Sequence, residues 1–323
     1  MSKIRINWKR LLVLFVAVFL MIQIIGSFFF YELAVKRGPK EFLQKNTDLE
    51  VSDQTMELFL NGNWIDWVAA QKFERLTLTS RDGLKLSGYY LPASTPTDKL
   101  VILNHGYLGN AKQMGLFGQH YHSDLNYNIF MPDARGHGES EGDYYGFGWP
   151  DRLDLIDWTN LLVKKIGPDT KVAYHGLSMG AATVLMASGE DEIPHQVKAI
   201  IADSPYESVY QLLAYQMNRM FHLPAFPLLD STSVLTKIRA GYSFREASVL
   251  NAVKKTDVPI LYIHGESDTF VPTKMAENLY QHTSSDAEIM LVPNANHGES
   301  FALDEDKYKR TMDQFLNRYI DLN

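Results

Sequence analysis

The chain has 323 residues, of which 46% are hydrophobic and 21% charged, so it can form one large core with a smaller appendage. Its formal net charge is −7 and its basic residues are scattered, which excludes a basic nucleic-acid-binding face. Cysteine is absent, which excludes a disulfide framework, a thiolate zinc site and a cysteine nucleophile.

The N-terminal region contains an apolar stretch over residues 11–30 with no charged side chain. Twenty helical residues at about 1.5 Å each match the roughly 30 Å hydrocarbon core of a bilayer. Trp8 on one side, and the aromatic run 28–31 on the other, are where interfacial aromatic residues belong. A cleaved signal peptide is the alternative, but its apolar region would be shorter and no small-x-small cleavage pattern follows. We expect a basic tail over 1–10 and an uncleaved transmembrane anchor over 11–31.

The orientation of this span is not decided by charge, because four basic residues stand on each side of it: Lys3, Arg5, Lys9 and Arg10 before it, and Lys36, Arg37, Lys40 and Lys45 after it. A short tail easily stays in the cytoplasm, and a large domain can be translocated largely regardless of its charge. We therefore expect a single-pass protein of the cell membrane with its catalytic domain outside the cytoplasm.

Residues 32–72 are predicted to form a linker followed by one or two helices that pack on the domain. Strands begin after it. Residues 73–79 and 84–91 alternate apolar and polar side chains around Asp82-Gly83, a hairpin pattern.

Short apolar runs then alternate with helix-length segments such as 151–165 and 274–281, which predicts parallel strands buried on both faces. With the hairpin, the sheet should have about eight mostly parallel strands with helices on both faces. The six further strands are expected at 100–103, 128–131, 171–174, 198–202, 259–263 and 288–292.

The interval between the strands at 198–202 and 259–263 is too long for a simple crossover helix. Residues 206–249 are predicted to form a small helical cap over the carboxyl edge of the sheet, where open α/β sheets bind ligands. Two helices that buttress the side of the sheet are the alternative.

The pattern GxSxG spans residues 176–180, directly after an apolar run and before small helix-forming residues. This order predicts strand, sharp turn and helix, with Ser178 exposed at the tip of the turn. A serine nucleophile needs a base, and the base needs an acid. His297 is the histidine that follows the last predicted strand, and Asp268 follows the strand before it. We expect the order Ser178, Asp268, His297.

Other residues are also candidates for the roles of acid and base. Glu266 is a weaker alternative acid, and Asp203, at the end of an earlier strand, is weaker still. His264 and His175 adjoin strands and are expected to be structural hydrogen-bonding residues. For the oxyanion, the amide of Met179 follows the nucleophile, and the amide of Tyr107 follows another strand end.

Four motifs in this order resemble the α/β-hydrolase family of serine hydrolases, close to bacterial membrane-anchored or secreted hydrolases related to the serine aminopeptidase and esterase groups. They are NHGY at 104–107, DARGHGES at 133–140, GLSMG at 176–180, and the GESD and NHG turns that hold Asp268 and His297. The resemblance covers 73–323 and implies the nucleophile, acid and base roles for Ser178, Asp268 and His297. It assigns Arg135–Gly138 to a structural turn. A single glycine before Tyr107 departs from the HGGG loop of lipases.

These features predict a serine hydrolase that cleaves carboxylic esters with an apolar acyl or aryl group through an acyl-enzyme. A serine aminopeptidase on the same fold is the alternative, although the acidic residues of the cap are offset by basic ones. An inactive anchored binding module is a third possibility, against which the complete set of motifs argues. We expect an ester or short peptide as substrate, the membrane as partner through residues 11–30, and no nucleic acid, cofactor or metal; the oligomeric state is open.

Overall fold

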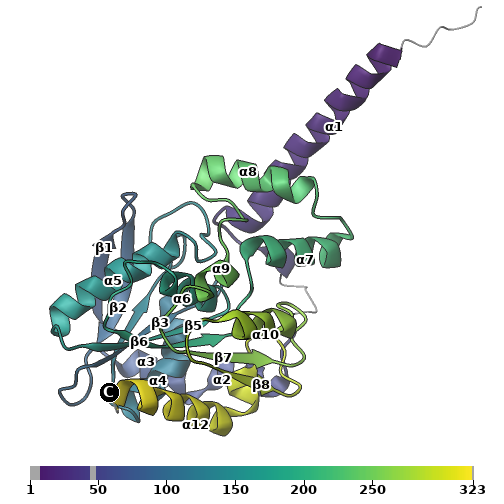
Figure 1. Ribbon diagram of the computed structural model, residues 1–323. Coiled ribbons are helices and arrows are strands. Elements are labelled where there is room, and N and C mark those ends of the chain that lie inside the picture. The colour runs from purple at the N-terminus through teal and green to yellow at the C-terminus, as the bar shows by residue number, and fades with distance from the viewer. Residues whose placement is uncertain (1–7, 44–48, 322–323) are drawn as a thin grey trace, which may run out of the picture.

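One eight-stranded sheet forms the centre of the protein in the computed structural model, which describes residues 8–43 and 49–321 (Figure 1). The strand order is β1-β2-β4-β3-β5-β6-β7-β8. The strands are β1 (Glu74–Thr79), β2 (Lys85–Leu91), β3 (Lys99–Asn104), β4 (Asn128–Pro132), β5 (Lys171–Leu177), β6 (Val197–Asp203), β7 (Ile260–Gly265) and β8 (Ala287–Val292).

The sheet is mostly parallel, as predicted. β1 and β2 form the expected antiparallel hairpin, β2 pairs antiparallel with β4, and β3 to β8 pair in parallel. The carboxyl ends of β3, β5, β6, β7 and β8 therefore meet at one edge, which is where the loops that carry the predicted site residues begin.

Helices cover both faces of this sheet (Figure 1). The α-helices are α1 (Trp8–Phe30), α2 (Asp53–Asn61), α3 (Asn63–Ala70), α4 (Gly115–Ser123), α5 (Asp151–Ile166), α6 (Met179–Ser188), α7 (Val209–Phe221), α8 (Leu228–Ala240), α9 (Val249–Val253), α10 (Thr273–His282), α11 (Ser300–Leu303) and α12 (Glu305–Leu316). Short 3-10 or π-helical turns lie at Tyr31–Val35, Glu41–Leu43, Ala111–Met114 and Asn317–Asp321.

The core consists of two layers, one on each face, because successive side chains of a strand point in opposite directions. In β3, Leu100 and Ile102 belong to the layer shared with α5 and α6, whereas Val101 and Leu103 belong to the layer shared with α4 and α12. All four side chains are fully buried. The near-continuous apolar runs in the sequence are therefore strands covered on both sides, as expected.

Helix α1 projects away from the rest of the molecule (Figure 1). Together with the turn that follows it, it forms the one segment among the described residues that is long and apolar enough to cross a membrane, a property shared by anchors and signal sequences. Its last turn differs from the expectation of interfacial aromatics. Phe30 and Tyr31 are 9% and 3% exposed, because they pack into the hydrophobic core of the domain instead.

The interval 206–249 contains α7 and α8. Helix α8 packs against α1, and α7 lies between α8 and the carboxyl edge of the sheet (Figure 1). The predicted linker region contains α2 and α3, which contact α11 and α4 respectively. Helix α8 thus contacts α1 on one side and α7 on the other, while the C-terminal end of α1 reaches the core of the domain.

Candidate active site

Ser178 occupies a strained turn between β5 and α6, with φ 55° and ψ −113°. The turn needs glycine on both sides. A Cβ on Gly176 would lie 2.2 Å from the carbonyl oxygen of Gly180, and one on Gly180 would lie 2.0 Å from that of Asn104. The predicted strand, sharp turn and helix are therefore present, and the strain at Ser178 is a mark of functional sites.

The structure brings Ser178, His297 and Asp268 into one hydrogen-bonded chain. Ser178 Oγ lies 2.9 Å from His297 Nε2, and His297 Nδ1 lies 2.7 Å from Asp268 Oδ2. With the ring proton on Nδ1, His297 donates to the carboxylate and accepts from the serine hydroxyl. Ser178 follows β5, Asp268 follows β7 and His297 follows β8. Because these strands are parallel, all three residues lie at the same edge of the sheet.

The carboxylate of Asp268 is held by its own loop. Its Oδ1 accepts hydrogen bonds from the amides of Phe270, at 3.0 Å, and Val271, at 2.7 Å. His264 Nε2 donates to the Val271 carbonyl at 2.8 Å and lies 3.1 Å from Asp268 Oδ2. His264 is thus a structural hydrogen-bonding residue, as expected. Its contact with Asp268, however, was not predicted.

The charges of this pair shift both pKa values. Burial alone would raise the pKa of the Asp268 carboxyl, but His297 and the hydrogen bonds from both histidines hold it well below its usual range. Burial alone would lower the pKa of His297, but the Asp268 carboxylate raises it above its usual value. Asp268 therefore stays ionised, and His297 titrates above an ordinary histidine.

The two alternative acids point elsewhere. Glu266 is exposed. The side chain of Asp203 accepts hydrogen bonds from Ser204 Oγ at 2.8 Å and Tyr308 Oη at 3.1 Å, and burial raises its pKa to about 6. Its backbone carbonyl accepts from the Ser178 amide at 2.7 Å. Asp203 supports the turn without a hydrogen bond to His297.

The turn after β3 lies against Ser178. A Cβ on Gly106 would be 3.5 Å from Ser178 Cβ, an ordinary contact, so Gly106 lies beside the nucleophile and the Tyr107 amide is the next one in the chain. The Met179 amide is the first of α6. Within the described part of the chain, neither amide donates a hydrogen bond to another protein group, which leaves both available to a ligand.

Two histidines that the sequence analysis did not single out hold this turn. His105 Nε2 accepts from the Ala134 amide at 3.0 Å, and His137 Nε2 accepts from the Leu108 amide at 3.3 Å. Burial lowers the pKa of both histidines, that of His137 to about 3, so both stay neutral as acceptors require. These two hydrogen bonds connect the NHGY and DARGHGES motifs. The presence of a histidine in each motif was the signal in the sequence that could have indicated this contact.

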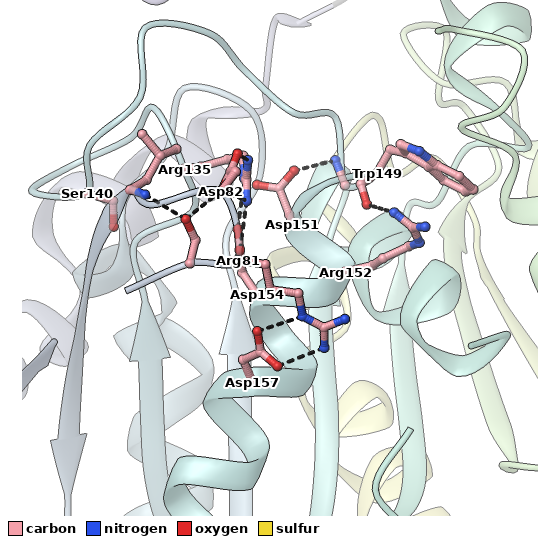
Figure 2. A network of polar contacts seen from close by, with 12 residues as sticks. Arg81, Asp82, Arg135, Ser140, Trp149, Asp151, Arg152, Asp154 and Asp157 are labelled. Atoms are coloured by element: carbon pink, nitrogen blue, oxygen red, sulfur yellow. Dashed lines mark hydrogen bonds and ion pairs between the residues drawn. The ribbon is translucent and has the colours of Figure 1, made fainter. Parts of the chain in front are cut away.

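Arg135 in the second motif anchors its turn by charge (Figure 2). Its guanidinium makes two hydrogen bonds of 2.8 Å to Asp154 and one of 2.8 Å to Asp82. The ion pair with Asp154 is buried, at 4% and 7% side-chain exposure, and ties the turn to α5. The pair with Asp82, whose side chain is 51% exposed, ties the turn to the β1–β2 hairpin. The expectation of a structural turn at 135–138 agrees with these contacts.

A cavity of about 810 Å³, open mouth included, lies between Ser178 and the cap. Ser178 is only 9% exposed, in contrast to the exposed serine that the turn alone predicts, because the cap covers it. The walls of the cavity are mostly apolar side chains from the end of α1 and the turn after it, from α7, and from the loops around Phe147, Phe244 and Phe270. No Asp or Glu is among its lining residues in the described ranges.

Several polar side chains in the cavity walls donate hydrogen bonds to backbone carbonyls. Tyr107 Oη donates to Ala34 at 2.7 Å, Tyr206 Oη to Phe147 at 2.9 Å, and Gln216 Nε2 to Phe270 at 2.6 Å. The surface offered to a ligand is therefore almost wholly apolar apart from Ser178 and the two amides. Within the described residues, 8–43 and 49–321, no group of three or more His, Asp or Glu side chains is arranged to hold a metal ion.

The fold, and the sharp turn that carries Ser178, define a hydrolase of the α/β class. The sequence profile of the α/β hydrolase fold matches residues 99–227, and that of a serine hydrolase family matches residues 228–297. Protein YqkD of Bacillus subtilis is 30% identical over 87% of this chain and 90% of its own length. Protein YfhR of Escherichia coli K12 is 28% identical over 75% of this chain and 80% of its own. The chain belongs to the α/β-hydrolase family of serine hydrolases, as the resemblance indicated.

Solved structures agree on the fold. An esterase of Pyrococcus furiosus superposes with a TM-score of 0.60 at 24% identity and covers 81% of this chain and 96% of its own. The acylaminoacyl peptidase of Pyrococcus horikoshii superposes with the same TM-score at 17% identity and covers 80% of this chain and 44% of its own. At these identities the similarity shows a shared fold but does not identify the substrate.

Proposed function

We propose that the protein is a carboxylester hydrolase with Ser178 as nucleophile, His297 as general base and Asp268 as the acid that orients it. The observation that carries this proposal is the hydrogen-bonded chain of 2.9 Å and 2.7 Å through the imidazole. Ser178 Oγ adds to the ester carbonyl while its proton passes to His297 Nε2. The amides of Met179 and Tyr107 would stabilise the oxyanion.

The intermediate then collapses to an acyl-enzyme as His297 returns the proton to the leaving alcohol. Water, deprotonated by the same imidazole, attacks the acyl carbon and releases the carboxylic acid and free Ser178. The apolar cavity supports an ester with an apolar acyl or aryl group. A peptidase that binds a free α-amine would gain from a carboxylate in the cavity wall. Two of the three acidic residues of the cap are paired elsewhere, Asp230 with Arg245 and Glu246 with Lys237, each at 2.8 Å or less. The third, Glu207, does not line the cavity.

The test compares full-length protein with Ser178→Ala. We expect a fluorophosphonate probe to label the protein and not the variant, and p-nitrophenyl esters to be cleaved much faster than aminoacyl p-nitroanilides. Labelling that survives in the variant would refute the nucleophile, and faster cleavage of the anilides would favour the aminopeptidase. No cleavage and no labelling of the unmodified protein would point to the inactive binding module, against which the intact chain of hydrogen bonds argues.

We further propose that residues 11–31 are a single-pass anchor, that 32–72 link it to a catalytic domain over 73–323 with its cap at 206–249, and that this domain lies outside the cytoplasm. The length and exposure of α1 support the anchor. Protease added to intact cells should digest the domain. A domain that remains whole until the cells are lysed would overturn the orientation.

A further inference from the structure

The end of α1 and the π-helical turn Tyr31–Val35 that follows it form part of the wall of the cavity that contains Ser178. Phe30, Leu33 and Ala34 line this cavity together with residues of α7 and α8. Phe30 packs edge to face on Phe221 of α7, with ring centroids 5.2 Å apart. The carbonyl of Ala34 accepts the 2.7 Å hydrogen bond from Tyr107. The apolar helix is therefore joined to the substrate cavity and to the proposed oxyanion turn.

Helix α8 crosses α1 within its apolar stretch. Ser231 Oγ donates to Gln23 Oε1 at 3.1 Å, and Gly26 lies directly beneath the Leu228 side chain, where a Cβ would be 2.7 Å away. Both contacts fall inside residues 11–30, so any bilayer that holds this stretch must reach α8. Figure 1 shows α8 lying across α1 on the side of the cap away from the sheet.

Helix α8 and the loop before it carry exposed apolar side chains. Three large side chains, which we call the cap face, are strongly exposed: Phe226 (74%), Val234 (61%) and Ile238 (76%). Arg239 lies beside them, with its guanidinium 5.2 Å from the ring centre of Phe28 in α1. Exposed apolar side chains next to a cation at the end of an apolar helix suit the boundary between acyl chains and anionic headgroups.

We infer that the cap face rests in the surface of the bilayer that holds α1, and that the enzyme takes from this bilayer an acyl ester lipid, whose chain enters the cavity between α1, α7 and α8. This inference rests on the proposed esterase function. The apolar walls accommodate the chain, and the ester carbonyl meets Ser178 at the polar end. The reaction consumes one water and yields a fatty acid and the alcohol that carried it.

The test uses the full chain in vesicles of phosphatidylethanolamine and phosphatidylglycerol. Two rates are measured: release of glycerol from monooleoylglycerol in the vesicles, and cleavage of p-nitrophenyl butyrate in solution. We expect the double variant F226E/I238E to lower the ratio of the first rate to the second about tenfold. The matched control is Leu60→Glu, because Leu60 is also apolar and 64% exposed but lies in α2, at the far end of the domain from α1 (Figure 1). This control should leave the ratio unchanged.

A second variant tests the cavity wall. Ala34→Phe should lower the rate ratio of p-nitrophenyl palmitate to p-nitrophenyl butyrate about tenfold, since the larger side chain would fill the space beside α1. Butyrate cleavage in each variant reports that the protein is folded. Unchanged ratios in both variants would overturn the inference. Absence of butyrate cleavage and of fluorophosphonate labelling in the unmodified protein would instead refute the esterase function itself.

Discussion

Gln216 of the cap helix α7 donates a 2.6 Å hydrogen bond to the carbonyl of Phe270, two residues beyond Asp268. Tyr215 Oη, on the same helix, donates to the carbonyl of Thr269 at 2.8 Å. The cap is thus bonded to the loop that presents the proposed acid. These two hydrogen bonds therefore help to hold the loop that carries Asp268.

Removal of this bond should impair catalysis. We expect Gln216→Ala to lower kcat about fivefold, because loss of about 1 kcal/mol from a buried hydrogen bond loosens the acid loop. The measurement is the steady-state kinetics of p-nitrophenyl butyrate cleavage. The control Gln211→Ala changes an exposed side chain on the same helix and should have no effect. Equal kinetics in the two variants would show that the bond does not position the acid.

Replacement of the acid should be far more damaging. Asp268→Asn should lower kcat by about 10⁴, the order found where the orienting carboxylate of such a triad is removed, because the wrong tautomer of the histidine is then favoured. The control is Glu266→Gln, an exposed position in the same loop. If this control lost as much activity as Asp268→Asn, the assignment of the acid would be wrong.

The pH profile should follow His297. The base must be neutral to accept the proton, so kcat/KM should rise as pH rises through the pKa of His297 in the free enzyme. Because Asp268 raises that pKa above the ordinary value of about 6.5, we expect half-maximal kcat/KM above pH 6.5. In Asp268→Asn the residual activity should reach its half-maximum at a lower pH. A midpoint that stays unchanged in the variant would contradict the coupling.

Stability should depend on the buried Arg135 far more than on an exposed arginine. Arg135→Met leaves the buried Asp154 carboxylate without its partner, so we expect a loss of about 3–5 kcal/mol in the free energy of unfolding. Arg81→Met removes ion pairs with Asp157 and Glu192, but the Arg81 side chain is 39% exposed, so we expect less than about 1 kcal/mol. Urea unfolding followed by tryptophan fluorescence measures both, and similar losses would contradict the role of burial.

Local patterns in the sequence were sufficient for the framework. All eight strands lie where alternating or continuous apolar runs placed them, with boundaries that differ by at most three residues. Side-chain periodicity and burial on two faces depend on neighbouring residues and can therefore be recognised in the sequence. The turn at Gly176–Gly180 could also be predicted from the sequence, because any such turn brings backbone atoms so close to these two positions that only glycine fits. The order of the strand-end loops then indicated Ser178, Asp268 and His297 as candidates, whose catalytic roles stay predictions.

Contacts between distant segments were decided only by the tertiary structure. The sequence treated residues 28–31 as interfacial aromatics, yet Phe30 and Tyr31 pack into the domain, and Phe30 lines the cavity with Ser178. It predicted a cap over the carboxyl edge of the sheet, but not that Ser178 would be only 9% exposed beneath it. Nor did it predict the hydrogen bond from Tyr107 to Ala34. Periodicity tells which face of a segment is apolar, but what covers that face depends on the packing of elements far apart in the chain, and this packing alone joins the apolar α1 to the cavity.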